Sequence, residues 1–188
     1  MEPILPKLVA DACRTMQSLL AQQEIFERIA AAVVGALNSG GKILTCGNGG
    51  SAADALHMAE ELVGRYRNNR RSLPGVCLNA DPTALTCIGN DFGFDEIFSR
   101  QVEGLGVKGD VLVCFSSSGN SPNIVRALDA ARKRGVRSVA LLGKDGGKAR
   151  GKADLELIVA SADTARIQEA HTLLLHALLE RVEQSIVD

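Results

Sequence analysis

The sequence has very few aromatic residues. Aromatics make up 3% of its 188 residues, with no Trp and a single Tyr. Proteins that stack bases on aromatic side chains need more of them. The formal net charge is -1, and no stretch gathers Lys and Arg into a basic stripe. We therefore expect no nucleic-acid partner.

The sequence contains five cysteines, which is an odd number, and no two of them form a CxxC motif. Cys46 and Cys114 fall in apolar segments, as does Cys77, which predicts small buried core residues in a reducing compartment. No apolar run reaches the roughly 18 residues that a membrane-spanning helix needs, and the first residues lack the pattern of a secretory signal. We expect a cytoplasmic protein without a membrane partner.

Two nucleotide-binding signatures are also missing. The chain contains no GxxxxGK[ST] phosphate loop, and its turn Gly47–Ser51 lacks the GxGxxG spacing of dinucleotide-binding folds. A nucleotide cofactor is therefore disfavoured.

What the chain does contain is an alternation of apolar strands with helices. The strands are almost continuous apolar runs, which is typical of strands covered on both faces. This pattern predicts an α/β fold: one domain with a five-stranded parallel sheet flanked by helices. We expect the strands at 42–46, 73–79, 111–115, 137–142 and 155–159, and the helices from 51, at 83–88, 95–105 and 123–134, and a long C-terminal helix at 162–186.

A helical arm over residues 1–40 precedes the first strand. Apolar residues recur at helical spacing from Leu8 to Asn38, with a possible division around Gln22–Glu24, and Gly40 and Gly41 end the pattern. Either the domain or a partner subunit must cover the apolar face of this arm.

Two connections look plainly polar. The segment 66–71, Tyr-Arg-Asn-Asn-Arg-Arg, is interpreted as a solvated loop, and the segment 90–94, Asn-Asp-Phe-Gly-Phe, as a turn.

Two polar loops follow strands and open helices. Asn48, Gly49 and Gly50 form a turn in which glycines allow close approach of a ligand to the backbone. Ser116–Ser121 places four hydroxyls at another strand end, where free N–H groups of the next helix suit a phosphate. A plain capping turn would need one serine, so an anion site is the better interpretation.

The sequence contains three histidines, and all of them lie in segments that we expect to be helical. His57 and Glu61 share one helical face because they are four residues apart. On the last helix, Gln168 and His176 lie on one side about 80° apart, whereas His171 is turned about 140° from His176. His57, Glu61, Gln168 and His176, if brought together, offer ligands for a divalent metal such as zinc; each alone would be structural.

The chain resembles the bacterial phosphoheptose isomerases, which are sugar-isomerase (SIS) domain proteins. The resemblance covers essentially the whole chain and rests on the segments CGNGGSAADALHMAEELVGRY, GNDFGFDEIFSRQV, SSSGNS, GKDGG and ARIQEAHTLLLH. The SSSGNS segment is general to SIS domains, whereas the His57/Glu61 and Gln168/His176 pairs are specific to the family. Ser117 stands where Thr is usual, and Ala52-Ala53 where some members have His-Cys.

The resemblance implies a homotetrameric aldose–ketose isomerase that converts sedoheptulose 7-phosphate to D-glycero-D-manno-heptose 7-phosphate, for lipopolysaccharide core or other surface polysaccharide. It implies Glu61 and His176 as the acid/base pair, and one zinc per subunit on His57, Glu61, Gln168 and His176. Substrate contacts are implied for Asn48, Gly49, Gly50, Glu61, Asn90, Asp91, Ser116, Ser117, Ser118, Ser121 and Gln168.

Two alternatives stay open. One is a non-catalytic SIS-domain regulator that binds the replication initiator; as that group is known, it lacks an acid/base pair at the positions of Glu61 and His176. The other is an isomerase acting on a hexose or pentose phosphate, since sequence spacing does not reveal the length of the pocket.

Overall fold

The computed structural model describes residues 3–186 and contains one five-stranded sheet. All strand pairs are parallel, and the spatial order is β2-β1-β3-β4-β5. The expected α/β fold with a five-stranded parallel sheet and flanking helices is confirmed. The strands are β1 (Ile43–Gly47), β2 (Gly75–Cys77), β3 (Val111–Ser116), β4 (Arg137–Gly143) and β5 (Leu155–Val159).

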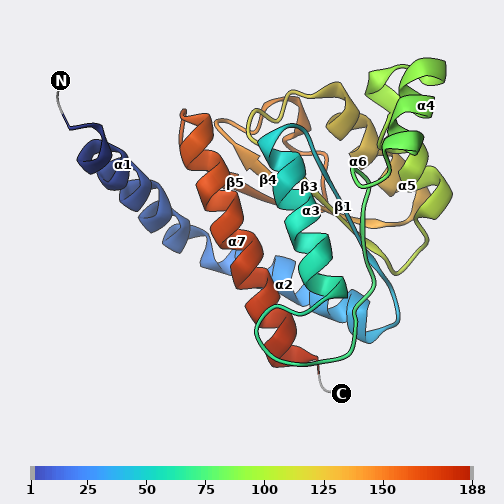
Figure 1. Cartoon of the computed structure of the whole chain (residues 1–188), viewed down its shortest axis with the longest axis horizontal. Helices are drawn as coiled ribbons and strands as arrows, with labels where there is room; N and C mark the ends of the chain where they lie inside the picture. The colour runs from blue at the N-terminus through green and yellow to red at the C-terminus, as the bar shows by residue number, and fades with distance from the viewer. Residues whose placement is uncertain (1–2, 187–188) are drawn as a thin grey trace.

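Helices cover both faces of the sheet (Figure 1). Alternate residues of β3 point to opposite faces, so Val113 and Phe115 join one apolar core and Leu112 and Cys114 join the other. The helices on the first core are α2 (Gln23–Asn38), α3 (Gly50–Val63) and α7 (Thr164–Ser185), and those on the second are α5 (Ser99–Leu105) and α6 (Pro122–Arg134).

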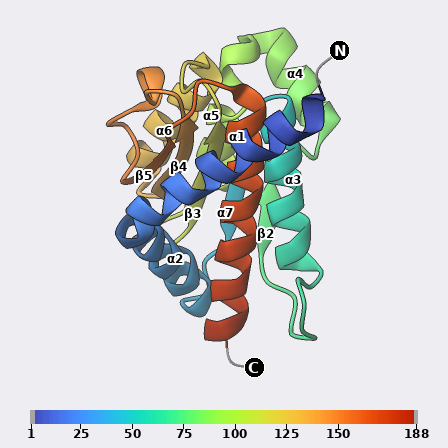
Figure 2. The same ribbon diagram turned by 90° about the vertical axis from the view of Figure 1, so that its left-hand side faces the viewer.

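The N-terminal helical segment is indeed divided in two. Helix α1 (Ile4–Ser18) and helix α2 are joined by a short 3-10 turn, Leu19–Gln22. Helix α1 crosses α7 (Figure 2) and extends beyond the body of the molecule (Figure 1). A hydrogen bond of 3.2 Å from the buried Arg166 guanidinium to the backbone oxygen of Leu8 ties α1 to the start of α7.

Three expected element boundaries are wrong. The helix expected at 95–105 begins only at Ser99, because Phe94–Glu96 forms a separate 3-10 turn. The second strand covers only Gly75–Cys77, because the segments on either side of it leave the ladder. Residues 90–92 do not form a turn but complete helix α4 (Pro82–Phe92), which Asp81 caps through its side chain and Gly93 ends with a φ of 90°. Two short 3-10 turns, Phe94–Glu96 and Gly147–Ala149, complete the described elements.

The sheet order fixes where a ligand can bind. From β1 the chain passes first to β2 on one side and then to β3 on the other, so the connections diverge between β1 and β3. In open parallel sheets, ligands bind outside the carboxyl ends of the strands at such a point.

Candidate active site

Helices α3 and α7 lie side by side and in register along one face of the sheet (Figures 1 and 2). We call this contact the α3/α7 seam, defined by three residue pairs: Gly50 with Gln168, Asp54 with Thr172, and His57 with His176. The two helices run in the same direction, since these pairs advance together along both. The first pair leaves no room for a side chain at Gly50, because a Cβ there would lie 2.1 Å from Nε2 of Gln168.

The middle pair of the seam is a buried hydrogen bond. The hydroxyl of Thr172 donates to Oδ1 of Asp54 over 2.8 Å and also contacts the backbone oxygen of Gln168. Burial raises the pKa of Asp54, although the Thr172 hydroxyl acts in the opposite direction. Because Thr172 is four residues from both Gln168 and His176, this bond holds the face of α7 that carries them against α3.

Imidazole and carboxylate groups meet at the third pair. Nε2 of His57 lies 3.5 Å from Oε1 of Glu61, and their side chains are 34% and 18% exposed, so solvent and small ligands can reach both. The ring of His176 meets the ring of His57 edge-on, with 5.0 Å between centroids. The structure therefore brings together the histidines and the carboxylate that the sequence placed on two separate helices.

The donor atoms of this cluster suit a divalent metal ion. One ligand atom each from His57, Glu60 and Glu61 lies within 4.8 Å of the other two. From α7, Gln168 and His176 contact α3, the helix that carries these three residues. Imidazole nitrogens and carboxylate oxygens are common zinc ligands, so the residues present fit such an ion. Glu60 is exposed and can also reach the group.

The Gly turn after β1 is fixed to the start of α6 at the divergence point of the sheet. The side-chain amides of Asn48 and Asn123 exchange two hydrogen bonds, of 2.8 and 3.0 Å. Asn79, which follows β2, bonds the backbone of Gly47 on the other side. The turn is thereby held from both neighbouring strand ends.

The serine loop after β3 is tightly folded. The hydroxyl of Ser116 accepts from the backbone N–H of Gly119, and that of Ser118 accepts from the N–H of Asn120. Gly119 has a φ of 62°, and a Cβ there would lie 1.9 Å from the backbone oxygen of Gly146. Ser121 precedes α6 without capping it through its side chain. Pro122 has no N–H, and the N–H groups of Ile124 and Val125 donate to the backbone oxygen of Ser121. In the first turn of this helix the N–H of Asn123 is therefore the donor left for an anion.

Asn90 and Asp91 lie apart from the seam. Both are on the exposed helix α4, at the edge of the molecule (Figure 1), where the amide of Asn90 bonds the carboxylate of Asp91 over 2.8 Å. The remaining expected contacts, Ser117 and Ser118, are half-buried in the serine loop.

His171 is separate from the site, as its position on the helix predicts. It is fully buried, its Nε2 lies 3.3 Å from the backbone oxygen of Leu142, and its ring packs edge-on against Phe115. Burial lowers the pKa of His171 to about 4, so the ring is neutral and structural.

The cysteines behave as the sequence predicts. Cys46, Cys77 and Cys114 are buried and free, and the sulfur atoms of Cys46 and Cys114 lie 3.5 Å apart on neighbouring strands. In the part of the chain from residue 3 to 186, no helix is both long and apolar enough to cross a membrane.

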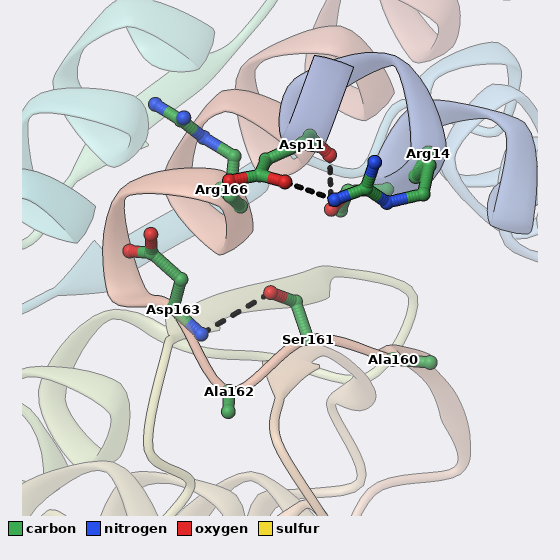
Figure 3. A pocket seen from close by; sticks show the side chains of 8 residues that line it. Asp11, Arg14, Ala160, Ser161, Ala162, Asp163 and Arg166 are labelled. Atoms are coloured by element: carbon green, nitrogen blue, oxygen red, sulfur yellow. Dashed lines mark hydrogen bonds and ion pairs between the residues drawn. The ribbon is translucent and has the colours of Figure 1, made fainter. Parts of the chain in front are cut away.

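A separate cavity of about 340 Å³ lies between α1 and the segment that leads into α7 (Figure 3). Asp11 and Arg14 of α1 form an ion pair at one side of it, and Ser161 and Asp163 line the other. None of the expected site residues lines this cavity, so it is separate from the candidate site.

Sequence reasoning missed two residues next to the cluster. The ring of Tyr66 stacks on the ring of His176, with 5.6 Å between centroids and 26° between planes. The carboxylate of Glu183 accepts hydrogen bonds from the backbone of the same loop. The interpretation of 66–71 as a solvated loop is therefore wrong for Tyr66 and for Arg70, whose side chain is 6% exposed. The single Tyr of the sequence was the available signal.

Known proteins share this chain's sequence and fold. A family model for the SIS domain matches residues 9–143. The phosphoheptose isomerase of Geobacter sp. (strain M21) is 50% identical over 175 residues, which cover 93% of this chain and 91% of the relative. The structure of a phosphoheptose isomerase from Neisseria gonorrhoeae aligns with a TM-score of 0.89 at 43% identity, covering 96% of this chain and 97% of the other.

A phosphoheptose isomerase from Francisella tularensis is also similar, with a TM-score of 0.88 at 33% identity over 97% of this chain and 99% of that one. These likenesses extend over the seam, the Gly turn and the serine loop, because nearly the whole chain is covered. The chain belongs to the phosphoheptose isomerase family of SIS-domain proteins.

Proposed function

We propose that the protein is an aldose–ketose isomerase that converts sedoheptulose 7-phosphate to D-glycero-D-manno-heptose 7-phosphate. The observation that carries the proposal is the meeting of His57 and Glu61 with His176 across the α3/α7 seam. Relatives at about half identity bear the name phosphoheptose isomerase. The product would enter heptose synthesis for lipopolysaccharide core or other surface polysaccharide.

The reaction moves a proton between adjacent carbons through an enediol or enediolate. A carboxylate and an imidazole can remove and return such a proton near neutral pH. We assign these roles to Glu61 and His176, one acting on each of the two carbons. Glu61 is partly exposed and lies on a rigid helix, which suits contact with substrate.

The phosphate is assigned to the serine loop and the N-terminus of α6. Helix N-terminal N–H groups and hydroxyls bind phosphate without a lysine. The assigned substrate contacts are Asn48, Gly49, Gly50, Asn90, Asp91, Ser116, Ser117, Ser118, Ser121 and Gln168, together with Glu61. The tight folding of the serine loop against Gly146 supports this role by holding its backbone and hydroxyl groups in a fixed arrangement.

One zinc ion per subunit would be held by His57, Glu61, Gln168 and His176. Zinc bound there polarises a carbonyl and stabilises developing negative charge. Glu61 would then serve both as a metal ligand and as an acid/base group, and a carboxylate that binds a metal ion is a weaker base. We therefore propose that Glu61 engages the ion only in part.

We further propose that residues 1–188 form a single SIS domain with 1–40 as its helical arm, and that the protein is a cytoplasmic homotetramer. Ile4, Leu5 and Val9 on α1 are 71%, 68% and 53% exposed. Helix α4 has no buried residue over its described length, Pro82–Phe92. Apolar surface left open in this way favours contact between subunits. The buried free thiols support a reducing compartment.

An isomerisation assay on sedoheptulose 7-phosphate tests the function. Glu61→Gln should lower kcat by at least about 100-fold, since loss of a general acid or base removes roughly that factor. Glu103→Gln, on the exposed surface of α5, is the matched control and should keep full activity. Wild-type protein that converts no heptose phosphate would contradict the proposal.

Chelation tests the metal separately. Activity that falls with a chelator and returns with zinc supports the zinc site, whereas activity indifferent to chelation leaves an acid/base site without metal. The rival function, a regulator that binds the replication initiator, is not favoured, because both Glu61 and His176 are present and the relatives above are named as isomerases.

A further inference from the structure

The imidazole of His176 is held between two rings. His57 of α3 meets it edge-on at 5.0 Å with planes at 83°, and Tyr66 stacks on it at 5.6 Å with planes at 26°. Tyr66 follows the end of α3 by three residues, so it extends the α3/α7 seam beyond the helix. Because the His176 ring is stacked on Tyr66 and contacts His57 edge-on, it has little freedom to rotate.

Tyr66 is itself held by a carboxylate of α7. Glu183 accepts hydrogen bonds from three consecutive backbone N–H groups, those of Tyr66 at 3.2 Å, Arg67 at 2.9 Å and Asn68 at 3.1 Å. Its side chain is only 6% exposed. Burial alone would raise the pKa of Glu183, but the N–H donors, with the Asn68 side chain, keep it below its usual value. A run of N–H groups around one anion fixes the backbone of the loop.

Arg70 closes the far end of this loop. Its guanidinium donates to the backbone oxygens of Glu61 and Leu62, at 2.7 and 2.9 Å, and so satisfies the end of α3. The same side chain lies 3.8 Å from the carboxylate of Glu183. The segment 66–70 is thus a strap, fixed at one end to α3 and at the other to α7.

We propose that Tyr66 is a positioning residue for His176, and that Glu183 fixes Tyr66 in place through the backbone of the strap 66–70. Tyr66 acts by restricting the imidazole and not by contacting substrate. The catalytic consequence rests on the proposed isomerase function, whereas the restriction of the ring does not.

A spectroscopic test reads the ring directly. Histidine ring resonances are recorded by NMR on the full chain, with and without added zinc; the chain has only three histidines, and His176→Gln assigns the signal. Stacking on an aromatic ring shifts the imidazole protons, so Tyr66→Leu should move the His176 signals toward their free positions. Tyr66→Phe should keep the shift, and the buried His171 should be unchanged in both, which reports an intact fold.

The strap is tested by a matched pair on α7. Glu183→Ala removes the acceptor of the three N–H groups and should move the His176 signals as Tyr66→Leu does. Glu180→Ala, one turn away, removes only an exposed ion pair with Arg67 and should leave them in place. Glu183→Ala should affect the His176 ring without changing residue 66, so it still tests the positioning role of Tyr66 if Tyr66→Leu does not fold.

Kinetics complete the test. Tyr66→Leu and Glu183→Ala should lower kcat about three- to tenfold with KM nearly unchanged, which is the factor expected when an aromatic pair is lost, and Tyr66→Phe should recover most of the rate. Unmoved His176 signals, or a moved ring with an unchanged kcat, would overturn the positioning role. If wild type lacks isomerase activity, the proposed function fails, while the NMR result still decides whether Tyr66 restricts His176.

Discussion

Gly50 is the residue at which the site depends most directly on the absence of a side chain. The amide of Gln168 occupies the space where a Cβ would project, 2.1 Å from Nε2. Gly50→Ala should therefore displace the Gln168 side chain, which is long and can turn away, without unfolding the chain. We expect a loss of at least about tenfold in kcat/KM, equivalent to about 1.4 kcal/mol, and weaker zinc binding by chelator competition.

Gly35→Ala is the matched control for that change. Gly35 lies on the exposed side of α2, and nothing stands within 4 Å of a Cβ there. The substitution should stabilise the helix by up to about 1 kcal/mol and leave activity unchanged. Equal loss of activity in both variants would show that Gly50 has no special place in the site.

His171 predicts a pH dependence of stability. Its pKa is about 4 in the folded chain and about 6.5 in the unfolded one. Below about pH 6.5 the imidazole of His171 becomes protonated in the unfolded chain, whereas it stays neutral in the folded chain. The free energy of unfolding therefore falls as the pH drops from the pKa of the unfolded chain toward that of the folded chain. From about pH 7 to about pH 5 the loss should be on the order of 2 kcal/mol.

The variant His171→Leu checks this prediction. Because the variant has no imidazole to protonate, its free energy of unfolding, measured with urea at one protein concentration, should fall less between the same pH values. Parallel curves for wild type and variant would exclude His171 as the source of the dependence.

Single residues were predicted well where chemistry and spacing decided them. The four-residue spacing placed His57 and Glu61 together, and the five-residue spacing kept His171 away from His176. It could not place Tyr66 on His176, because that contact depends on a carboxylate 117 positions away in the chain, at Glu183. The zinc ligand set and the acid/base roles came from the family resemblance and stay predictions.

At the scale of elements, the reciprocal bonds of Asn48 and Asn123 hold the Gly turn to the start of α6. Asn123 is 1% exposed, so Asn123→Ala leaves the Asn48 amide without its partner. We expect about 1 to 3 kcal/mol less stability by urea unfolding. KM for the sugar phosphate should rise several-fold, because the Gly turn and the serine loop, to which we assign substrate contacts, then move relative to each other.

Asn38→Ala is the control for this variant, since Asn38 is an exposed residue at the end of α2. It should change neither KM nor the midpoint of unfolding appreciably. An unaltered KM in Asn123→Ala would argue that the two loops are positioned independently.

The elements themselves were mostly predictable, because buried parallel strands are continuous apolar runs and glycines end the helices. One of the errors fell where polar residues continue a helix. Asn90 and Asp91 suggested a turn, yet α4 runs through them because Asp81 caps its start and no break occurs before Gly93. Which helices become neighbours was not predictable, since the register of α3 and α7 is set by packing on the sheet.

At the scale of the whole molecule, α1 presents apolar side chains to solvent. Leu5→Glu places a charge on a surface that is 68% exposed in one subunit, so it should not unfold the subunit. If the tetramer uses this face, the variant should dissociate into smaller species, as measured by light scattering after size-exclusion chromatography. Lys7→Glu changes charge on the same helix at a polar position and should keep the assembly; dissociation of both would point to charge alone.

The placement of Gln168, Thr172 and His176 has a consequence for synthesis on the ribosome. One side of the α3/α7 seam belongs to the last helix of the described chain, whereas the sheet, the Gly turn and the serine loop precede it. During translation the sheet strands can emerge and pair while α7 is still inside the exit tunnel. The proposed metal and acid/base site would therefore stay incomplete in the nascent protein until α7 is released, so we expect the proposed activity to appear only after α7 has left the tunnel.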